Sequence, residues 1–172
     1  MIPALLGAGL MMATAGPLWP VEIQSLNQVI HQQSARLAKP DLPVKEYVAG
    51  RKTLRADLNG NHRDDLAVLF TLERGDLWIQ YLAVISSAGK ALATIEVSRV
   101  GVRAVDLDRA DGPVLQLSTK TYGAEDQRCC PSVLGHTAYR LKGNRLTEIR
   151  MPSGAVASNG APPMRHARRR HR

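Results

Sequence analysis

A chain of 172 residues is long enough for one domain with a packed core and too short for two such domains. Hydrophobic residues make up 44% of the sequence but aromatic residues only 4%, so we expect an aliphatic core and no aromatic surface for stacking sugars or bases. Of the formal charge of +8, five units come from arginines at the end of the chain, which leaves +3 for the rest and gives no indication of specific nucleic-acid binding.

The first 15 residues form an uncharged apolar run, MIPALLGAGLMMATA. The run is shorter than the roughly 20 residues that span a bilayer, and it ends in Ala13-Thr14-Ala15, which is typical of a signal-peptide cleavage site. We interpret residues 1–15 as a signal peptide, although no Lys or Arg precedes the apolar run. A buried N-terminal helix is the alternative. The mature chain would then be exported, to the periplasm or the extracellular space, without a transmembrane segment.

A helical pattern follows the predicted cleavage site. From Val21 to Leu37 apolar residues recur at helical spacing, with Gln, Asn and Ser between them. This spacing predicts one amphipathic helix. The segment 39–43, KPDLP, contains two prolines and is expected to end it.

The following hundred or so residues alternate short β-forming segments with turn sequences such as Asp111-Gly112. The expected strands are 47–58, 67–73, 77–86, 91–97, 100–107, 114–122, 137–141 and 145–149. We predict an α+β fold in which the N-terminal amphipathic helix packs on an antiparallel meander sheet of about seven strands. The prediction places one β-rich domain over residues 16–151.

An acidic loop joins the first two expected strands and carries oxygen-bearing side chains at alternate positions. A tight loop turns alternate side chains inward, so those of Asp57, Asn59 and Asn61 can converge. The backbone carbonyl of Arg63 and the carboxylate of Asp65 would complete a set of hard oxygen ligands, the type that calcium prefers. Alternatively, the Asn and Asp side chains bond the turn themselves without an ion. A catalytic role for these carboxylates is the third alternative.

The segment 57–65, DLNGNHRDD, resembles the calcium loop of FG-GAP or integrin-alpha-type repeats, D-x-[DN]-x-D-G-x-x-D followed by an apolar strand. The chain contains one such copy, so the resemblance implies a weak calcium site and no propeller. Two positions depart from the pattern. Asn61 replaces an acid and so removes a charge, and His62 replaces a glycine that usually serves a turn at positive φ.

The two cysteines of the chain, Cys129 and Cys130, are adjacent. Neighbouring Cα atoms lie about 3.8 Å apart, below the usual disulfide range of about 4.4–6.8 Å. A vicinal disulfide therefore requires a strained turn and is easily reduced. Unpaired or intermolecular thiols are an alternative. Metal binding is another, with His136 as a third ligand, but the sequence provides no convincing fourth.

The run EDQRCCPS, from Glu125 to Ser132, resembles the D-x-x-C-C-P segment of LppP/LprE-type bacterial envelope lipoproteins, in which a single β-rich domain ends in the same way. The similarity extends loosely from the acidic loop to about Ile149. It implies a fold and a bacterial envelope location more than a biochemical function. The chain departs from that family in lacking a lipobox cysteine.

No catalytic residues are predicted. Asp126, Ser132 and His136 lie close in sequence, but no nucleophile elbow or glycine-rich oxyanion turn accompanies them. Asp106 and Asp108 fit a strand end beside a hairpin better than an acidic site.

The chain ends in a tail, residues 152–172, that is rich in small and polar residues and finishes in MRHARRRHR. Such a composition cannot bury enough apolar surface to fold, so we expect disorder. The tail arginines are candidates for salt-dependent binding of an anionic envelope polymer. They are Arg165, Arg168, Arg169, Arg170 and Arg172. A solvated terminus without a specific role is the alternative.

These patterns predict an exported bacterial envelope or periplasmic protein that acts as a non-enzymatic binding or structural module. Calcium is its one candidate cofactor. One alternative is a redox-responsive or enzyme-like envelope protein that uses Cys129 and Cys130. Another is a polyanion-associated protein that acts through its basic tail.

Overall fold

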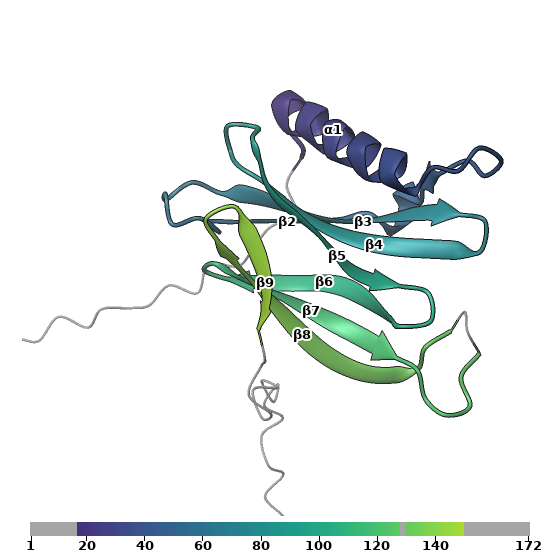
Figure 1. The fold of residues 1–172 in the computed structure, drawn as a ribbon. Helices are drawn as coiled ribbons and strands as arrows, with labels where there is room; N and C mark the ends of the chain where they lie inside the picture. The colour runs from purple at the N-terminus through teal and green to yellow at the C-terminus, as the bar shows by residue number, and fades with distance from the viewer. Residues whose placement is uncertain (1–16, 128–129, 150–172) are drawn as a thin grey trace, which may run out of the picture.

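The computed structural model describes residues 17–127 and 130–149. Within these ranges one α-helix, one 3-10 helix and a nine-stranded antiparallel sheet are formed (Figure 1). The elements are α1 (Pro20–Leu37), β1 (Lys45–Glu46), η1 (Val48–Gly50), β2 (Lys52–Ala56), β3 (Asp65–Arg74), β4 (Leu77–Ile85), β5 (Ala91–Arg99), β6 (Arg103–Asp111), β7 (Val114–Thr121), β8 (Val133–Lys142) and β9 (Arg145–Ile149). The sheet order is β1-β3-β4-β5-β6-β7-β8-β9, and β2 also pairs with β3.

The broad α+β prediction agrees with this structure, but the sheet has nine strands rather than about seven. The segment 47–58, expected to be one strand, contains η1 and β2. Before it lies β1, which has only two residues and pairs with the end of β3. A strand of two charged residues carries no hydrophobic alternation, so the sequence pattern could not reveal it.

Helix α1 lies within one residue of its predicted bounds. Its first residue is Pro20, whose fixed φ suits the first helical position and whose missing N–H is not needed there. The backbone N–H of Trp19 donates to Oε2 of Glu22 at 2.9 Å, which secures the start of the helix. The helix ends at Leu37, before the segment 39–43, as its prolines predicted.

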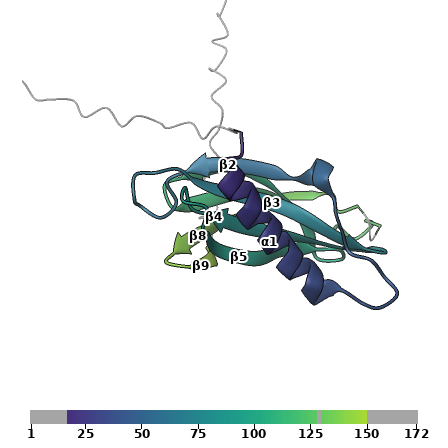
Figure 2. The same ribbon diagram turned by 90° about the horizontal axis from the view of Figure 1, so that it is seen from above.

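Strand β3 is buried along both faces from Asp65 to Leu72, which explains its uninterrupted apolar run. One face contributes Ala67 and Leu69 to a cluster that contains residues of β2 and of β4 to β9. The other face contributes alternate residues to a second cluster, together with Leu26 and Val29 of α1. Helix α1 lies across β3 and β4 in both views (Figures 1 and 2).

The sheet is divided by a corner between β5 and β6. These strands pair at one position only, Arg99 with Arg103. Strands β2–β5 and β6–β9 therefore form two layers, with β2 beside β6 and β5 beside β9 (Figure 1). Past the corner, the amide of Gln80 takes the place of a neighbouring strand for β6. Its Nε2 donates to the carbonyl of Val105 at 3.0 Å, and its Oε1 accepts from the N–H of Val105 at 2.8 Å.

Polar contacts between distant residues tie α1 to the sheet, among them the bond from the guanidinium of Arg74 on β3 to the carbonyl of Leu37. The guanidinium of Arg55 on β2 donates to both carboxylate oxygens of Glu22, at 2.8 and 2.6 Å, and lies 4.6 Å from the centre of the Trp19 ring. The hydroxyl of Ser25 donates to the carbonyl of Gly89 in the β4–β5 turn. Gly89 has φ of 76°, and a Cβ there would lie 2.2 Å from Cγ2 of Val21. The turn therefore meets α1 at a position that only glycine fits.

Candidate functional site

The acidic loop between β2 and β3 is held together by the carboxylate of Asp57. Its Oδ1 accepts the backbone N–H groups of Gly60 at 2.8 Å and Asn61 at 3.0 Å, and its Oδ2 accepts that of His62 at 2.9 Å. Three consecutive backbone donors therefore point at one side chain. This arrangement draws the loop into a compact turn around Asp57.

The two asparagines of the loop repeat this pattern. Oδ1 of Asn59 accepts the N–H of Asn61 at 3.0 Å, and Oδ1 of Asn61 accepts the N–H of Arg63 at 2.9 Å. These are the local turns that Asn and Asp side chains form readily. His62 has φ of 62°, so the position at which the resemblance expects glycine is left-handed here too.

Asp65 is the fully buried member of the predicted ligand set. Its side chain is 0% exposed, and it accepts the N–H of Asn59 at Oδ2, 3.1 Å, and Nδ2 of Asn59 at Oδ1, 3.0 Å. Burial raises the pKa of Asp65 above the ordinary aspartate value, while N–H groups of Leu58, Asn59 and Ser87 lower it and the charge of Asp57 raises it further. The net direction is upward, so neutral donors do not fully offset the desolvation of this carboxylate.

Neither of the two predicted ligand carboxylates, Asp57 and Asp65, has a strong cationic partner among the described residues. Asp65 forms no ion pair there, and Asp57 has only His62 Nδ1 at 3.9 Å from its Oδ2. Hydrogen bonds thus link four of the predicted ligands, Asp57, Asn59, Asn61 and Asp65. Arg63 joins them through its backbone N–H, and its carbonyl is the predicted ligand atom.

The donor set of the loop fits a hard cation in chemical type. It contains two carboxylates and two amide oxygens, and each amide oxygen accepts one backbone N–H and retains a second lone pair. Across residues 17–127 and 130–149 no group of three or more His, Cys, Asp or Glu is placed to hold a metal, so an ion here would need amide and backbone oxygens in addition to the two carboxylates.

The loop before β8 is closed by Asp126, the acid of the D-x-x-C-C-P segment. Its Oδ2 accepts the N–H groups of Gly123 and Ser132, each at 2.8 Å, and its Oδ1 accepts the hydroxyl of Ser132 at 2.8 Å. The N–H of Gly123 is the largest cause that lowers the pKa of Asp126 below the ordinary aspartate value. The acid of this segment therefore joins Gly123 to Ser132, near the two ends of the loop between β7 and β8, which is called the cysteine loop below.

Cys130 lies in this loop, and its N–H donates to the carbonyl of Gln127 at 2.9 Å. Cys130 is disulfide-bonded, whereas Cys129 lies outside the described residues. The predicted bridge between the two remains a prediction. The predicted signal peptide, residues 1–15, and the five tail arginines, Arg165, Arg168, Arg169, Arg170 and Arg172, also lie outside the described residues.

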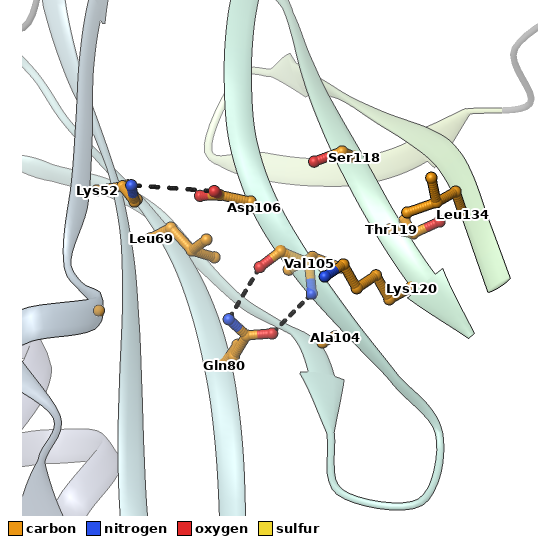
Figure 3. A pocket seen from close by; sticks show the side chains of 11 residues that line it. Lys52, Leu69, Gln80, Ala104, Val105, Asp106, Ser118, Thr119, Lys120 and Leu134 are labelled. Carbon is orange, nitrogen blue, oxygen red and sulfur yellow. Dashed lines mark hydrogen bonds and ion pairs between the residues drawn. The ribbon is translucent and has the colours of Figure 1, made fainter. Parts of the chain in front are cut away.

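A cavity of about 310 Å³ opens where β2 lies beside β6 (Figure 3). No sequence pattern indicates this cavity, because its walls come from six strands and η1 and share no motif. Asp106, which the sequence assigned to a strand, lies in β6 and also lines this cavity, 3.9 Å from Nζ of Lys52. Asp108, which is also predicted to lie at a strand end, accepts the hydroxyl of Ser118 at 3.1 Å.

Comparisons with protein-family models, with curated proteins and with solved structures find no match to this chain. The resemblances to FG-GAP loops and to LppP/LprE-type lipoproteins therefore remain expectations from the sequence. None of the helices in the described parts of the chain combines the length and the apolar character needed to cross a bilayer.

Proposed function

We propose that this protein is an exported bacterial envelope or periplasmic module, non-enzymatic, in which calcium bound by the acidic loop stabilises the joint between β2 and β3. The observation that carries the proposal is the carboxylate of Asp65, which is fully buried and forms no ion pair with any described residue. In this module α1 packs on the sheet and is tied to β2 through Glu22 and Arg55.

A buried carboxylate without a cation is costly, because desolvation penalises its charged form. The raised pKa of Asp65 is a sign of that penalty. Calcium would offset it, since the ion is bound through hard oxygens and favours the ionised carboxylate. Asp57, whose side chain is 30% exposed and has one weak histidine contact, would supply a second carboxylate.

The ligands proposed are the side-chain oxygens of Asp57, Asn59, Asn61 and Asp65 and the carbonyl of Arg63. Asn61 supplies a neutral oxygen where the related pattern has an acid, so the affinity is expected to be weak. Bound calcium would supply a cross-link between the ends of two strands and no reaction chemistry. The contribution of the loop to the stability of the β2–β3 joint would then depend on bound calcium.

The test is thermal unfolding of the protein in EDTA and then in millimolar calcium. Calcium at a hundredfold excess over its dissociation constant should stabilise the fold by about 2.7 kcal/mol, which raises the melting temperature by several degrees in a chain of this size. Magnesium, which needs a tighter octahedral shell, should act less.

Two variants make this test specific. Asp65→Asn keeps the size of the side chain and should abolish the calcium-dependent shift. Asp64→Asn removes the same charge from the neighbouring residue, which is exposed and is not a proposed ligand, and should leave the shift intact. Equal behaviour of the two variants, or no shift in the unmodified protein, would leave the loop as a turn that its own side chains satisfy.

The two other predicted functions rest on residues outside the described ranges. A redox-responsive role requires Cys129, and association with an anionic polymer requires the tail arginines. The disulfide at Cys130 supports the first of these. Intact-mass analysis under mild reductant, with partner binding measured before and after reduction, tests it.

A further inference from the structure

We propose that the cavity between β2 and β6 binds a small amphipathic carboxylate, with its apolar body over Leu69 and Val105 and its charged group at the ammonium of Lys120. This site is separate from the acidic loop, so it neither requires nor excludes calcium binding there. It assigns a ligand class to the binding module proposed above.

The cavity follows from the architecture of the sheet. β2 pairs only with β3, and β6 pairs with β5 at a single position, so the facing edges of β2 and β6 are not joined by a ladder. The side chains of Lys52 and Asp106 meet across this gap, at 3.9 Å. Between these edges lies a volume of about 310 Å³, at the lower end of the range of small-molecule sites.

The inner wall of the cavity is apolar. Leu69 is 1% exposed and Val105 is 6% exposed, and both line the cavity. At its other side lies Leu134 of β8, which is 76% exposed (Figure 3). A leucine so exposed at the wall of a cavity offers apolar surface that a ligand would remove from water.

The charged groups around the cavity favour an anion. Lys52 is matched by Asp106, although their separation of 3.9 Å and their exposure make this a weak pair. Lys120 forms no ion pair with any described residue, and its side chain extends from β7 toward Val105 (Figure 3). The three groups together carry one net positive charge, which a single carboxylate would neutralise.

The hydrogen bonds of Gln80 favour a small molecule over an extended peptide. A peptide that added a strand to β6 would need its free backbone donors and acceptors. The amide of Gln80 already satisfies both backbone groups of Val105, and the side chain of Asp106 accepts the N–H of Leu107 at 2.9 Å. The backbone groups of β6 at the cavity are therefore already hydrogen-bonded. A ligand there can still make apolar contacts and can pair with the one unmatched positive charge.

Octanoate is a suitable probe, because it combines an apolar body with one carboxylate. We expect saturable one-to-one binding to the full chain by titration calorimetry, with amide shifts at Val105, Lys120 and Leu134 in NMR spectra. Octanol, which lacks the charge, and octylammonium, which reverses it, should each bind at least about tenfold more weakly. Absence of saturable octanoate binding, or equal binding of octylammonium, would overturn the proposal.

Two variants locate the site, and both replace exposed side chains, so the fold should persist. Lys120→Gln should weaken octanoate binding about tenfold or more and remove its preference over octanol. Leu134→Ser should weaken octanoate and octanol alike. Lys142→Gln, a matched change at an exposed lysine at the end of β8, should have no effect. Unchanged octanoate affinity in Lys120→Gln would refute the assignment of the carboxylate to that lysine, and the proposal with it.

Discussion

The carboxylate of Glu22 and the guanidinium of Arg55 form a two-pronged ion pair with both side chains almost entirely removed from solvent, at 0% and 9% exposure. The hydrogen bond to Glu22 is the main cause that raises the pKa of Arg55. A third bond runs from the same guanidinium to the carbonyl of Pro17 at 2.9 Å. The start of α1 is therefore fixed to β2 by a charged pair, in addition to the apolar contacts of the helix with β3 and β4.

Glu22→Gln leaves Arg55 buried without a counter-charge. We expect a loss of about 3 kcal/mol in the free energy of unfolding, because breaking one partner of a buried pair is far more costly than the pair is favourable. Urea unfolding measures this loss. The matched control is Glu96→Gln, since Glu96 and Arg99 form a similar bidentate pair on the surface, and its loss should stay below about 1 kcal/mol. Equal losses at the two pairs would contradict this account.

Gln80→Met keeps the length of the side chain but removes the two bonds to Val105. The N–H and C=O of Val105 lie at the corner between the layers, where no β5 partner is available, so both lose their described partner. We expect a loss of about 1–3 kcal/mol by denaturant unfolding.

Faster hydrogen exchange at the N–H of Val105 should accompany that loss. Gln116→Met serves as the control, because among the described residues the side chain of Gln116 bonds only the exposed side chain of Arg109. A slow Val105 amide in Gln80→Met would show that another group replaces the glutamine.

Calcium stabilisation should depend on pH through Asp65. The pKa of this residue is raised in the folded state, so without calcium its contribution favours folding at low pH and is lost as pH rises through that raised pKa. Calcium favours the ionised form, so its effect on the melting temperature should be small near about pH 4 and grow toward about pH 7. The measurement is the calcium-induced shift at several pH values. A shift of constant size would place the ion at groups other than Asp65.

Asp126→Ala should loosen the cysteine loop without unfolding the protein. The carboxylate accepts two backbone N–H groups, those of Gly123 and Ser132, which become free to exchange. We expect hydrogen exchange to accelerate at these two amides and the melting temperature to change little, because the loop is largely exposed. Glu125→Ala is the neighbouring control and should leave both amides slow.

Local features of this fold were accessible from the sequence. The run from Leu66 to Leu72 identified a buried strand because both faces of β3 are covered. The sequence of residues 57–65 predicts a turn by itself, because the side chains of Asp57 and the two asparagines bond backbone groups within five residues. Asp111-Gly112 marked the hairpin between β6 and β7, where Gly112 has φ of 51°.

Features that depend on distant pairs could not be predicted. Gln80 and Val105 are 25 residues apart, and Glu22 and Arg55 are 33 apart. Nothing in the local pattern links the members of either pair. β6 spans Arg103–Asp111 rather than the predicted residues 100–107. Its outward residues are mostly charged, and its start is set by the corner at Arg99 and Arg103. The cavity arises from that corner, so it could not be predicted from the sequence either.

The contacts of α1 also bear on the order in which the chain is completed. This helix precedes all the strands in sequence, yet Ser25 bonds the carbonyl of Gly89, 64 residues later. During synthesis the residues of α1 are therefore made before those of its binding surface. Its apolar side chains can be buried only after the β4–β5 hairpin has been synthesised, so α1 is expected to dock late in folding.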